Sequence, residues 1–173
     1  MGFSSPYAVS KVLVENQLAY YRGRGLDTVV ARPFNHSGPG QGPGFLIPDL
    51  IRRVTDSSSE DVLSVGSLST RRDYTDVRDV ARAYLSLITA PSLSHDIYNV
   101  ASGTTRSGRE ILAAVSVALG RPVPETRVDP SLVRPNDPAS ITGDATRLRA
   151  ETGWAPDIAF EQMIADSVAS VTA

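Results

Sequence analysis

The sequence predicts an α/β fold, because short apolar runs typical of buried strands alternate with longer amphipathic stretches typical of helices. The chain has 173 residues, which is enough for one domain with a sizeable core. No internal repeat or low-complexity segment interrupts the alternation. We therefore expect residues 1–173 to form a single α/β domain.

A helix is predicted at the start of the chain, from Pro6 to about Tyr21. Proline suits the first turn of a helix, and Ser4 or Ser5 can cap it. Apolar residues then recur at helical spacing, and one of two following glycines can end the helix.

Tyr7 and Lys11 lie four residues apart on this helix, so they share one face. A neighbouring ammonium favours the phenolate and lowers the pKa of the phenol, which suits proton transfer near neutral pH. Lys11 is the only lysine among 17 Lys and Arg residues. The pair is thus a candidate acid–base site; the alternative is a chance pair on a packing helix.

The next segment combines a strand, a long loop and a helix. The apolar run 26–31 predicts a buried strand. Residues 32–44 are rich in Gly and Pro, so we expect them to lack regular structure, and the length of this loop indicates a function. Residues 45–54 read as a helix that starts near Pro48.

Strands and helices continue to alternate through the rest of the chain. The expected strands are 62–65, 71–77, 97–100 and 125–128, and the expected helices are one after Asp76 or Asp79, then 111–119, 144–153 and 160–171. Ser107 and Glu110 have the spacing of a capping box ahead of helix 111–119. Trp154 is expected to pack in the core rather than to bind a ligand.

Composition excludes several classes of function. A net charge of −2 gives no reason to expect binding to nucleic acid or to a membrane surface. The chain has no cysteine and two histidines, His36 and His95, so we expect neither disulfides nor a metal site. No apolar run is long enough to span a bilayer, so we expect a cytoplasmic protein.

Six motifs in order resemble one known family. They are Ser5-Pro6-Tyr7-x-x-x-Lys11, Arg32-Pro33-Phe34-Asn35-His36-Ser37-Gly38-Pro39-Gly40, Arg71-Arg72-Asp73-Tyr74-Thr75-Asp76-Val77-Arg78-Asp79, Tyr98-Asn99-Val100-Ala101-Ser102-Gly103, Arg134-Pro135-x-Asp137 and Gly153-Trp154-x-Pro156. This order resembles the C-terminal half of extended short-chain dehydrogenase/reductases of the NAD-dependent epimerase/dehydratase family. Within that family the chain is most similar to GDP-4-keto-6-deoxy-mannose reductases and GDP-mannose 4,6-dehydratases.

The resemblance implies a fold and a set of cofactor and catalytic residues. The fold would be part of a Rossmann-type parallel sheet with a small α/β substrate-binding domain. Tyr7 would protonate the C4 oxygen of the sugar as hydride arrives. Lys11 would lower the pKa of Tyr7 and bind the ribose of the NAD(P) nicotinamide nucleotide. The backbone of Pro33 and Phe34 would run beside the nicotinamide amide.

The same resemblance implies a substrate site for a nucleotide sugar. Asn35 would contact the substrate, and Arg72 and Arg134 would grip the diphosphate with planar guanidinium groups. The plainer alternative for the two arginines is surface ion pairing with Asp73 and Asp137.

The chain departs from the family pattern in its cofactor motifs. It has no strand followed by G-x-G-x-x-G and no catalytic Ser or Thr on a strand before Tyr7. The segment 38–42 contains too much Pro and does not open a helix in a βαβ unit, so it does not replace the motif. We therefore expect a truncated domain without the dinucleotide-binding strands, which binds no NAD(P) tightly by itself.

Three functions remain open on this sequence. The first is a fragment or non-redox derivative of a nucleotide-sugar reductase or dehydratase. The second is a cofactor-independent isomerase, lyase or cyclase that reuses Tyr7 and Lys11, for instance in natural-product biosynthesis. The third is a non-catalytic binding module. We also expect a homo-oligomer rather than a monomer, because truncation would uncover apolar sheet surface and the first helix forms a dimer interface in the family.

Overall fold

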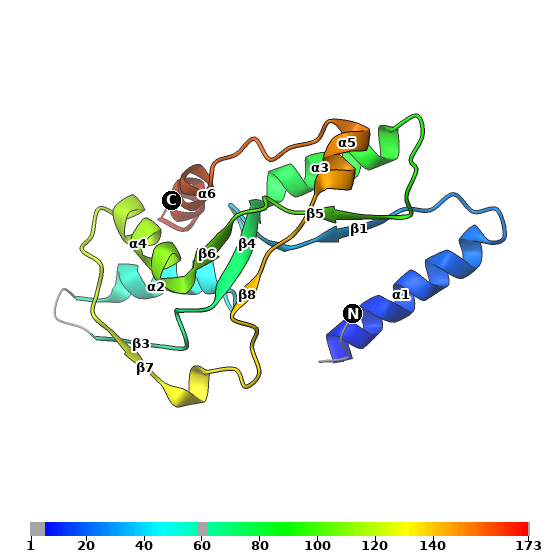
Figure 1. Ribbon diagram of the computed structural model, residues 1–173. Coiled ribbons are helices and arrows are strands. Elements are labelled where there is room, and N and C mark those ends of the chain that lie inside the picture. The colour runs from blue at the N-terminus through cyan, green and yellow to red at the C-terminus, as the bar shows by residue number, and fades with distance from the viewer. Residues whose placement is uncertain (1–5, 59–61, 173) are drawn as a thin grey trace.

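A computed structural model describes residues 6–58 and 62–172, and it has the predicted α/β architecture (Figure 1). The elements are, in order, α1 (Pro6–Arg22), β1 (Val30–Pro33), β2 (Asn35–Ser37), α2 (Leu46–Asp56), β3 (Leu63–Val65), β4 (Arg71–Asp76), α3 (Val77–Thr89), β5 (Ile97–Val100), β6 (Thr105–Ser107), α4 (Gly108–Ala118), β7 (Thr126–Val128), the 3-10 helix η1 (Pro130–Leu132), β8 (Ser140–Ile141), α5 (Thr146–Thr152) and α6 (Phe160–Thr172). The proposed capping residues Ser4 and Ser5 lie outside the described residues.

The strands form three small sheets in which parallel pairing dominates. β1 pairs with β5, β2 with β4, and β3 with β7, all in parallel. β4 is the central strand of the middle sheet, since it also pairs antiparallel with β6 and parallel with β8. Segments far apart in sequence therefore meet at β4, which carries one of the predicted substrate arginines.

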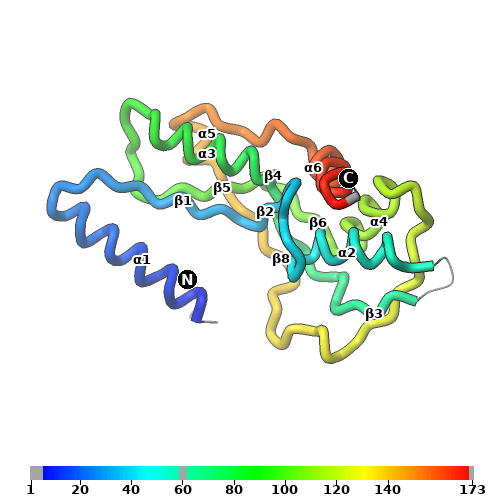
Figure 2. Tube along the Cα trace, turned by 180° about the vertical axis from the view of Figure 1, so that it is seen from behind, coloured from blue at the N-terminus to red at the C-terminus, as the bar shows by residue number. Residues whose placement is uncertain are grey.

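Two hydrophobic clusters hold these layers together. The larger cluster lies among α2, α4, α6 and β3, and its most buried members include Ile51 and Val115. The smaller cluster joins α3, α5 and β5, and it contains Tyr98 and Trp154. Figure 2 shows the three helices of the first cluster gathered on one side, away from α3 and α5. The prediction that Trp154 packs in the core is confirmed, since it is 3% exposed and its Nε1–H donates to the Asp79 carbonyl at 3.0 Å.

Local capping signals were predicted correctly where they depend on neighbouring residues. The Ser107 hydroxyl accepts from the Glu110 amide, and the Glu110 carboxylate accepts from Ser107, which completes a capping box for α4. Asp76 caps α3, because its carboxylate accepts from the Arg78 amide at 2.8 Å. Gly153 ends α5 with a left-handed φ of 71°, a conformation that glycine adopts without steric cost.

Asp79 was wrongly considered as a helix cap. It lies inside α3 and is fully buried, and its carboxylate accepts from the backbone amides of Asp157 and Ile158 and from the Arg82 guanidinium. Its function is therefore to dock the segment before α6 onto α3. The sequence pattern that predicts a helix start is local, whereas the Asp79 carboxylate accepts from the amides of Asp157 and Ile158, far along the chain.

The loop predicted over 32–44 also needs correction. β1 extends to Pro33, and β2 occupies Asn35–Ser37, so the first part of this segment is regular structure. The strand predicted from Leu26 begins at Val30, where pairing with Ile97 starts. These short strands exist because β5 and β4 supply partners, which a Gly/Pro count along the chain does not reveal.

Candidate functional site

Asn35 and Arg72, two of the predicted substrate residues, lie on neighbouring strands. The register places Asn35 of β2 beside Tyr74 of β4. Arg72 precedes Tyr74 by two residues, so both side chains point to the same face of the sheet. The structure thus brings Asn35 and Arg72 to one region, with Tyr74 between them.

Arg72 is already tied to the segment that carries Arg134. Its Nη2–H donates to the Asp137 carboxylate at 2.6 Å, and Nη1 donates to the carbonyls of Arg71 at 2.7 Å and Pro138 at 2.9 Å. The Arg72 side chain is only 14% exposed. Among the described residues no acceptor faces its Nε–H, so part of the guanidinium remains able to bind an anion. The ion pair with Asp137, one of the alternatives for Arg72, is present.

Tyr74 is a candidate site residue to which the sequence alone assigned no role. Its ring is half-buried against the core of α2, α4 and α6. Burial raises the pKa of the Tyr74 hydroxyl, while the positive charges of Arg72 and Arg134 act in the opposite direction. The hydroxyl therefore stays protonated at neutral pH and can donate a hydrogen bond beside both arginines. The sequence does contain a signal for Tyr74: it lies two residues after Arg72 on a predicted strand, so both side chains share one face.

Asp73 faces the other side of β4 and is not a surface partner of Arg72. It is fully buried, and its carboxylate accepts four hydrogen bonds: from the Ser102 amide at 2.9 Å, the Ser102 hydroxyl at 2.6 Å, the Gly103 amide at 2.9 Å and the Gly143 amide at 3.1 Å. These donors come from the loop after β5 and from the segment after β8. Asp73 thus joins two loops beneath the strand that carries Arg72 and Tyr74.

Tyr7 and Lys11 lie together on α1, as their spacing predicted. The Lys11 Nζ atom is 5.2 Å from the centre of the Tyr7 ring, and the Tyr7 side chain is 71% exposed. Within the described part of the chain, no hydrogen bond or ion pair joins this pair to Asn35, Arg72 or Arg134. The pair and the two arginines are therefore separate groups in the present arrangement.

Pro33 and Phe34 lie at the end of β1 and in the connection to β2. The Phe34 amide donates to the Val100 carbonyl at 2.9 Å, and the His36 Nδ1 atom lies 3.0 Å from the Phe34 carbonyl. Both backbone groups of Phe34 thus have partners. A nicotinamide amide beside this segment would meet an ordered backbone in which the N–H and C=O groups of Phe34 already have partners within the protein.

The Gly-rich segment after β2 leads into α2, the helix predicted over 45–54, but the strands on either side of α2 lie in different sheets, so this is not a βαβ unit. β2 ends at Ser37, and α2 begins at Leu46, with Phe45 as its N-cap directly after Gly44. However, the Gly44 amide donates to the Asp49 carboxylate at 3.0 Å, and Asp49 lies in the first turn of α2. A negative side chain there opposes the binding of a pyrophosphate. These residues therefore do not fit the diphosphate of a dinucleotide.

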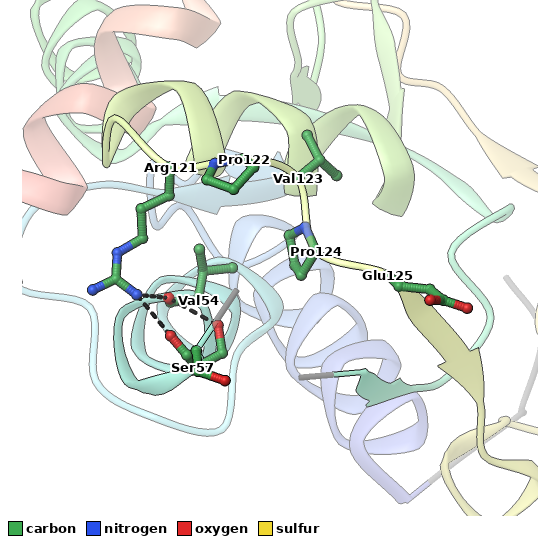
Figure 3. A pocket seen from close by; sticks show the side chains of 8 residues that line it. Val54, Ser57, Arg121, Pro122, Val123, Pro124 and Glu125 are labelled. Carbon is green, nitrogen blue, oxygen red and sulfur yellow. Dashed lines mark hydrogen bonds between the residues drawn. The ribbon is translucent and has the colours of Figure 1, made fainter. Parts of the chain in front are cut away.

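Two cavities among the described residues are lined by none of the predicted site residues. One of about 390 Å³ lies beside the C-terminal end of α2, where Figure 3 shows Arg121 pointing at that helix. Its guanidinium donates to the carbonyls of Val54 at 2.7 Å and Ser57 at 2.9 Å. The arginine therefore caps α2, and no predicted site residue lines this cavity. A second cavity, of about 270 Å³, is bordered by Tyr74 and by the residues before α6.

Across residues 6–58 and 62–172, no group of three or more His, Asp or Glu side chains is placed to hold a metal ion. None of the helices in these ranges combines the length and the apolar character that crossing a bilayer requires.

Comparison with known proteins identifies the family. The model of the GDP-mannose 4,6 dehydratase family matches residues 3–167. This chain belongs to that family. A GDP-6-deoxy-D-mannose reductase of Pseudomonas aeruginosa is 36% identical over 168 residues, which cover 92% of this chain and 53% of the relative.

Solved structures of this family and its neighbours share the fold. The RMD protein of Pseudomonas aeruginosa, complexed with NADPH, superposes with a TM-score of 0.85 and 32% identity over 96% of this chain and 56% of that one. A UDP-glucose 4-epimerase from Bifidobacterium longum, in complex with NAD+ and UDP, gives a TM-score of 0.84 and 25% identity over 99% and 56%. The chain spans about half the length of the relatives it matches. The resemblance to GDP-4-keto-6-deoxy-mannose reductases and dehydratases is confirmed.

Proposed function

We propose that this chain binds the nucleotide diphosphate of a GDP-sugar, as part of a reductase or dehydratase of its family. The observation that carries the proposal is the common face of β2 and β4, where Asn35, Tyr74 and Arg72 lie side by side. The positive charges of Arg72 and Arg134 both act to lower the pKa of the Tyr74 hydroxyl. This supports a site in which two cations bind one diphosphate.

The two arginines have different parts in this proposal. Arg134 is exposed on the segment between η1 and β8, so its whole guanidinium can reach a phosphate. Arg72 uses three of its N–H groups within the protein and offers the remaining ones from a fixed position. Arg134 therefore supplies most of the adjustable charge, while Arg72 and Tyr74 supply preorganised donors.

For the cofactor we propose NAD(P), with Tyr7 and Lys11 at its nicotinamide end. The family relatives and the NADPH complex of the Pseudomonas protein support the assignment. In this proposal Tyr7 moves a proton at a sugar oxygen, and the neighbouring cation of Lys11, 5.2 Å from the centre of the Tyr7 ring, supports that role. Since Asp49 occupies the start of α2, we expect this chain by itself to bind NAD(P)H only weakly. A micromolar dissociation constant for NADPH in calorimetry would contradict that expectation.

A titration with GDP tests the substrate site directly. We expect weak binding, and Arg134→Ala should lower the affinity at least about tenfold, equivalent to about 1.4 kcal/mol. Arg149→Ala removes an exposed arginine from α5 and serves as the matched control, with unchanged affinity expected. Higher salt should weaken binding to the exposed Arg134.

The result that would overturn the proposal is equally clear. If GDP, UDP and their sugars at millimolar concentration leave the melting temperature unchanged, the diphosphate site does not exist in this chain. Equal losses in Arg134→Ala and Arg149→Ala would show that any observed binding is unspecific attraction to positive charge.

We also propose that the chain self-associates through apolar side chains of α1. Leu13 is 59% exposed, and Tyr20 and Tyr21 are more than half exposed, which is unusual for side chains of this size. Light scattering over a range of concentrations should give a mass above the 18.5 kDa of one chain. A mass of one chain throughout would exclude this assembly.

A further inference from the structure

The helix that carries Tyr7 and Lys11 has almost no packing of its own. None of the described residues of α1 is buried. In Figure 1 the helix runs apart from the layers formed by α2, α4 and α6. The least exposed apolar side chains of α1, among them Val12 and Leu18, are only half-buried, so polar contacts add to what fixes the position of its functional side chains.

Two arginines provide the contacts that tie α1 to the body of the molecule. At the C-terminal end, Arg22 donates from Nε and Nη2 to the Thr28 carbonyl, at 3.2 and 3.0 Å, and pairs with Asp96 at 2.7 Å. Near the middle, Arg32 of β1 makes a two-pronged pair with Glu15. Its Nε atom is 2.8 Å from Oε1, and its Nη2 atom is 2.5 Å from Oε2.

We infer that the Glu15–Arg32 pair is a positioning device that sets the Tyr7–Lys11 pair against the end of β1; its catalytic meaning rests on the function proposed above. Arg32 immediately precedes Pro33 and Phe34, the predicted cofactor segment. Glu15 lies one turn from Lys11 and two turns from Tyr7. The ion pair therefore links the two groups of predicted cofactor residues by one bidentate contact.

The surroundings favour a well-defined pair rather than a loose surface contact. Glu15 is 18% exposed and Arg32 is 35% exposed, so both are partly shielded from water. The hydrogen bonds from Arg32 lower the pKa of Glu15, and those to Glu15 raise the pKa of Arg32. Arg32 is itself held in register beside Asn99 of β5. A bidentate pair on a fixed strand restricts orientation as well as distance.

The distance of Tyr7 from Arg22 along the helix explains why the Glu15–Arg32 pair matters. With a rise of about 1.5 Å per residue, Tyr7 lies about 22 Å from Arg22 and about 12 Å from Glu15 along the helix axis. If α1 pivoted at Arg22 by about 10°, the Tyr7 end would move by about 4 Å. A displacement of about 1 Å can already cost on the order of a hundredfold in rate, so Glu15 supplies a constraint that Arg22 cannot.

Electron-spin distance measurements test this inference on the chain as it is. The protein has no cysteine, so Ser10→Cys on α1 and Ala81→Cys on α3 provide two unique sites for nitroxide labels, both at exposed positions. We expect one narrow distance distribution in this background. Glu15→Gln should broaden it or shift it by several ångström. The charge-swapped double variant, Glu15→Arg with Arg32→Glu, should restore the narrow distribution.

Controls separate positioning from stability and from the proposed function. Glu161→Gln removes an acidic group from the looser Arg106–Glu161 pair at 3.7 Å and should leave the distribution unchanged. A narrow, unshifted distribution in Glu15→Gln would overturn the inference, even if the melting temperature fell, and so would failure of the swapped pair to restore it. No ligand is needed, so the result can be read even if GDP and NADPH do not bind.

Discussion

The helices α1 and α2 are held in the fold by different interactions. In α2, Ile47, Leu50, Ile51 and Val54 recur on one face, and each is at most 2% exposed. In α1 the apolar residues are distributed around the helix, and no described residue is buried. Full burial of apolar side chains thus stabilises α2, whereas in α1 half-buried apolar side chains are supplemented by ion pairs and hydrogen bonds. The region with the predicted acid–base pair is therefore the less constrained one.

The largest expected difference between the two helices is in how much the free energy of unfolding falls when an apolar side chain is truncated to alanine. Ile51→Ala should lower the free energy of unfolding by about 3–4 kcal/mol, because it leaves a cavity in the core. Leu13→Ala, on the exposed surface of α1, should change it by less than about 0.5 kcal/mol. Urea denaturation of both variants measures the contrast. A similar loss in both would mean that α1 is packed in solution, for instance against a second copy.

A second contrast concerns polar contacts in the core and on the exposed segment before β8. Asp73→Asn replaces a buried carboxylate oxygen by an amide that faces the N–H groups of Gly103 and Gly143. We expect a loss of about 2–3 kcal/mol in urea denaturation, because buried donors lose their acceptor. Asp137→Asn, on the exposed segment near Arg72, is the control and should cost less than about 1 kcal/mol. Equal effects would contradict the supporting role of Asp73.

Glu15→Gln should have a smaller and more local effect. The pair with Arg32 is partly exposed, so we expect a loss of about 1 kcal/mol confined to α1. Amide exchange in α1 should become about fivefold faster, while exchange in α2 stays the same. Hydrogen exchange followed by mass spectrometry measures both helices in one experiment. Faster exchange in α2 as well would show that the two helices unfold together.

Acid should reveal a further contrast, at the second hydrophobic cluster. Glu151 accepts from the Tyr98 hydroxyl at 2.6 Å and the Ser94 amide at 2.7 Å, with His95 also in contact, and its pKa falls to about 2 from 4.5. A lowered pKa stabilises the folded state above the ordinary value. That stability is lost as the pH falls from about 4.5 to about 2.

Thermal melts of Glu151→Gln test this pH dependence. The variant should be less stable than the parent chain at neutral pH, and its melting temperature should fall less steeply in the acid range. Glu161→Gln, an exposed acidic residue with a looser pair, should follow the parent chain. Parallel pH curves for Glu151→Gln and the parent chain would contradict the expectation.

Local chemistry determined much of what the sequence predicted. The capping box of α4, the glycine end of α5 and the Tyr7–Lys11 spacing each depend on residues within a few positions of one another. The order of motifs also identified the family. Such features follow from backbone geometry, which is the same wherever the segment lies in the fold.

The tertiary structure alone decided the features that join distant segments. β2, β6 and β8 are two or three residues long, and each exists because β4 supplies its hydrogen-bond partners. The register that sets Asn35 beside Tyr74, the four donors around Asp73 and the pair between Glu15 and Arg32 likewise join residues 17 to 70 positions apart. Periodicity determines which face of a strand or helix a residue occupies; only packing determines what that face meets.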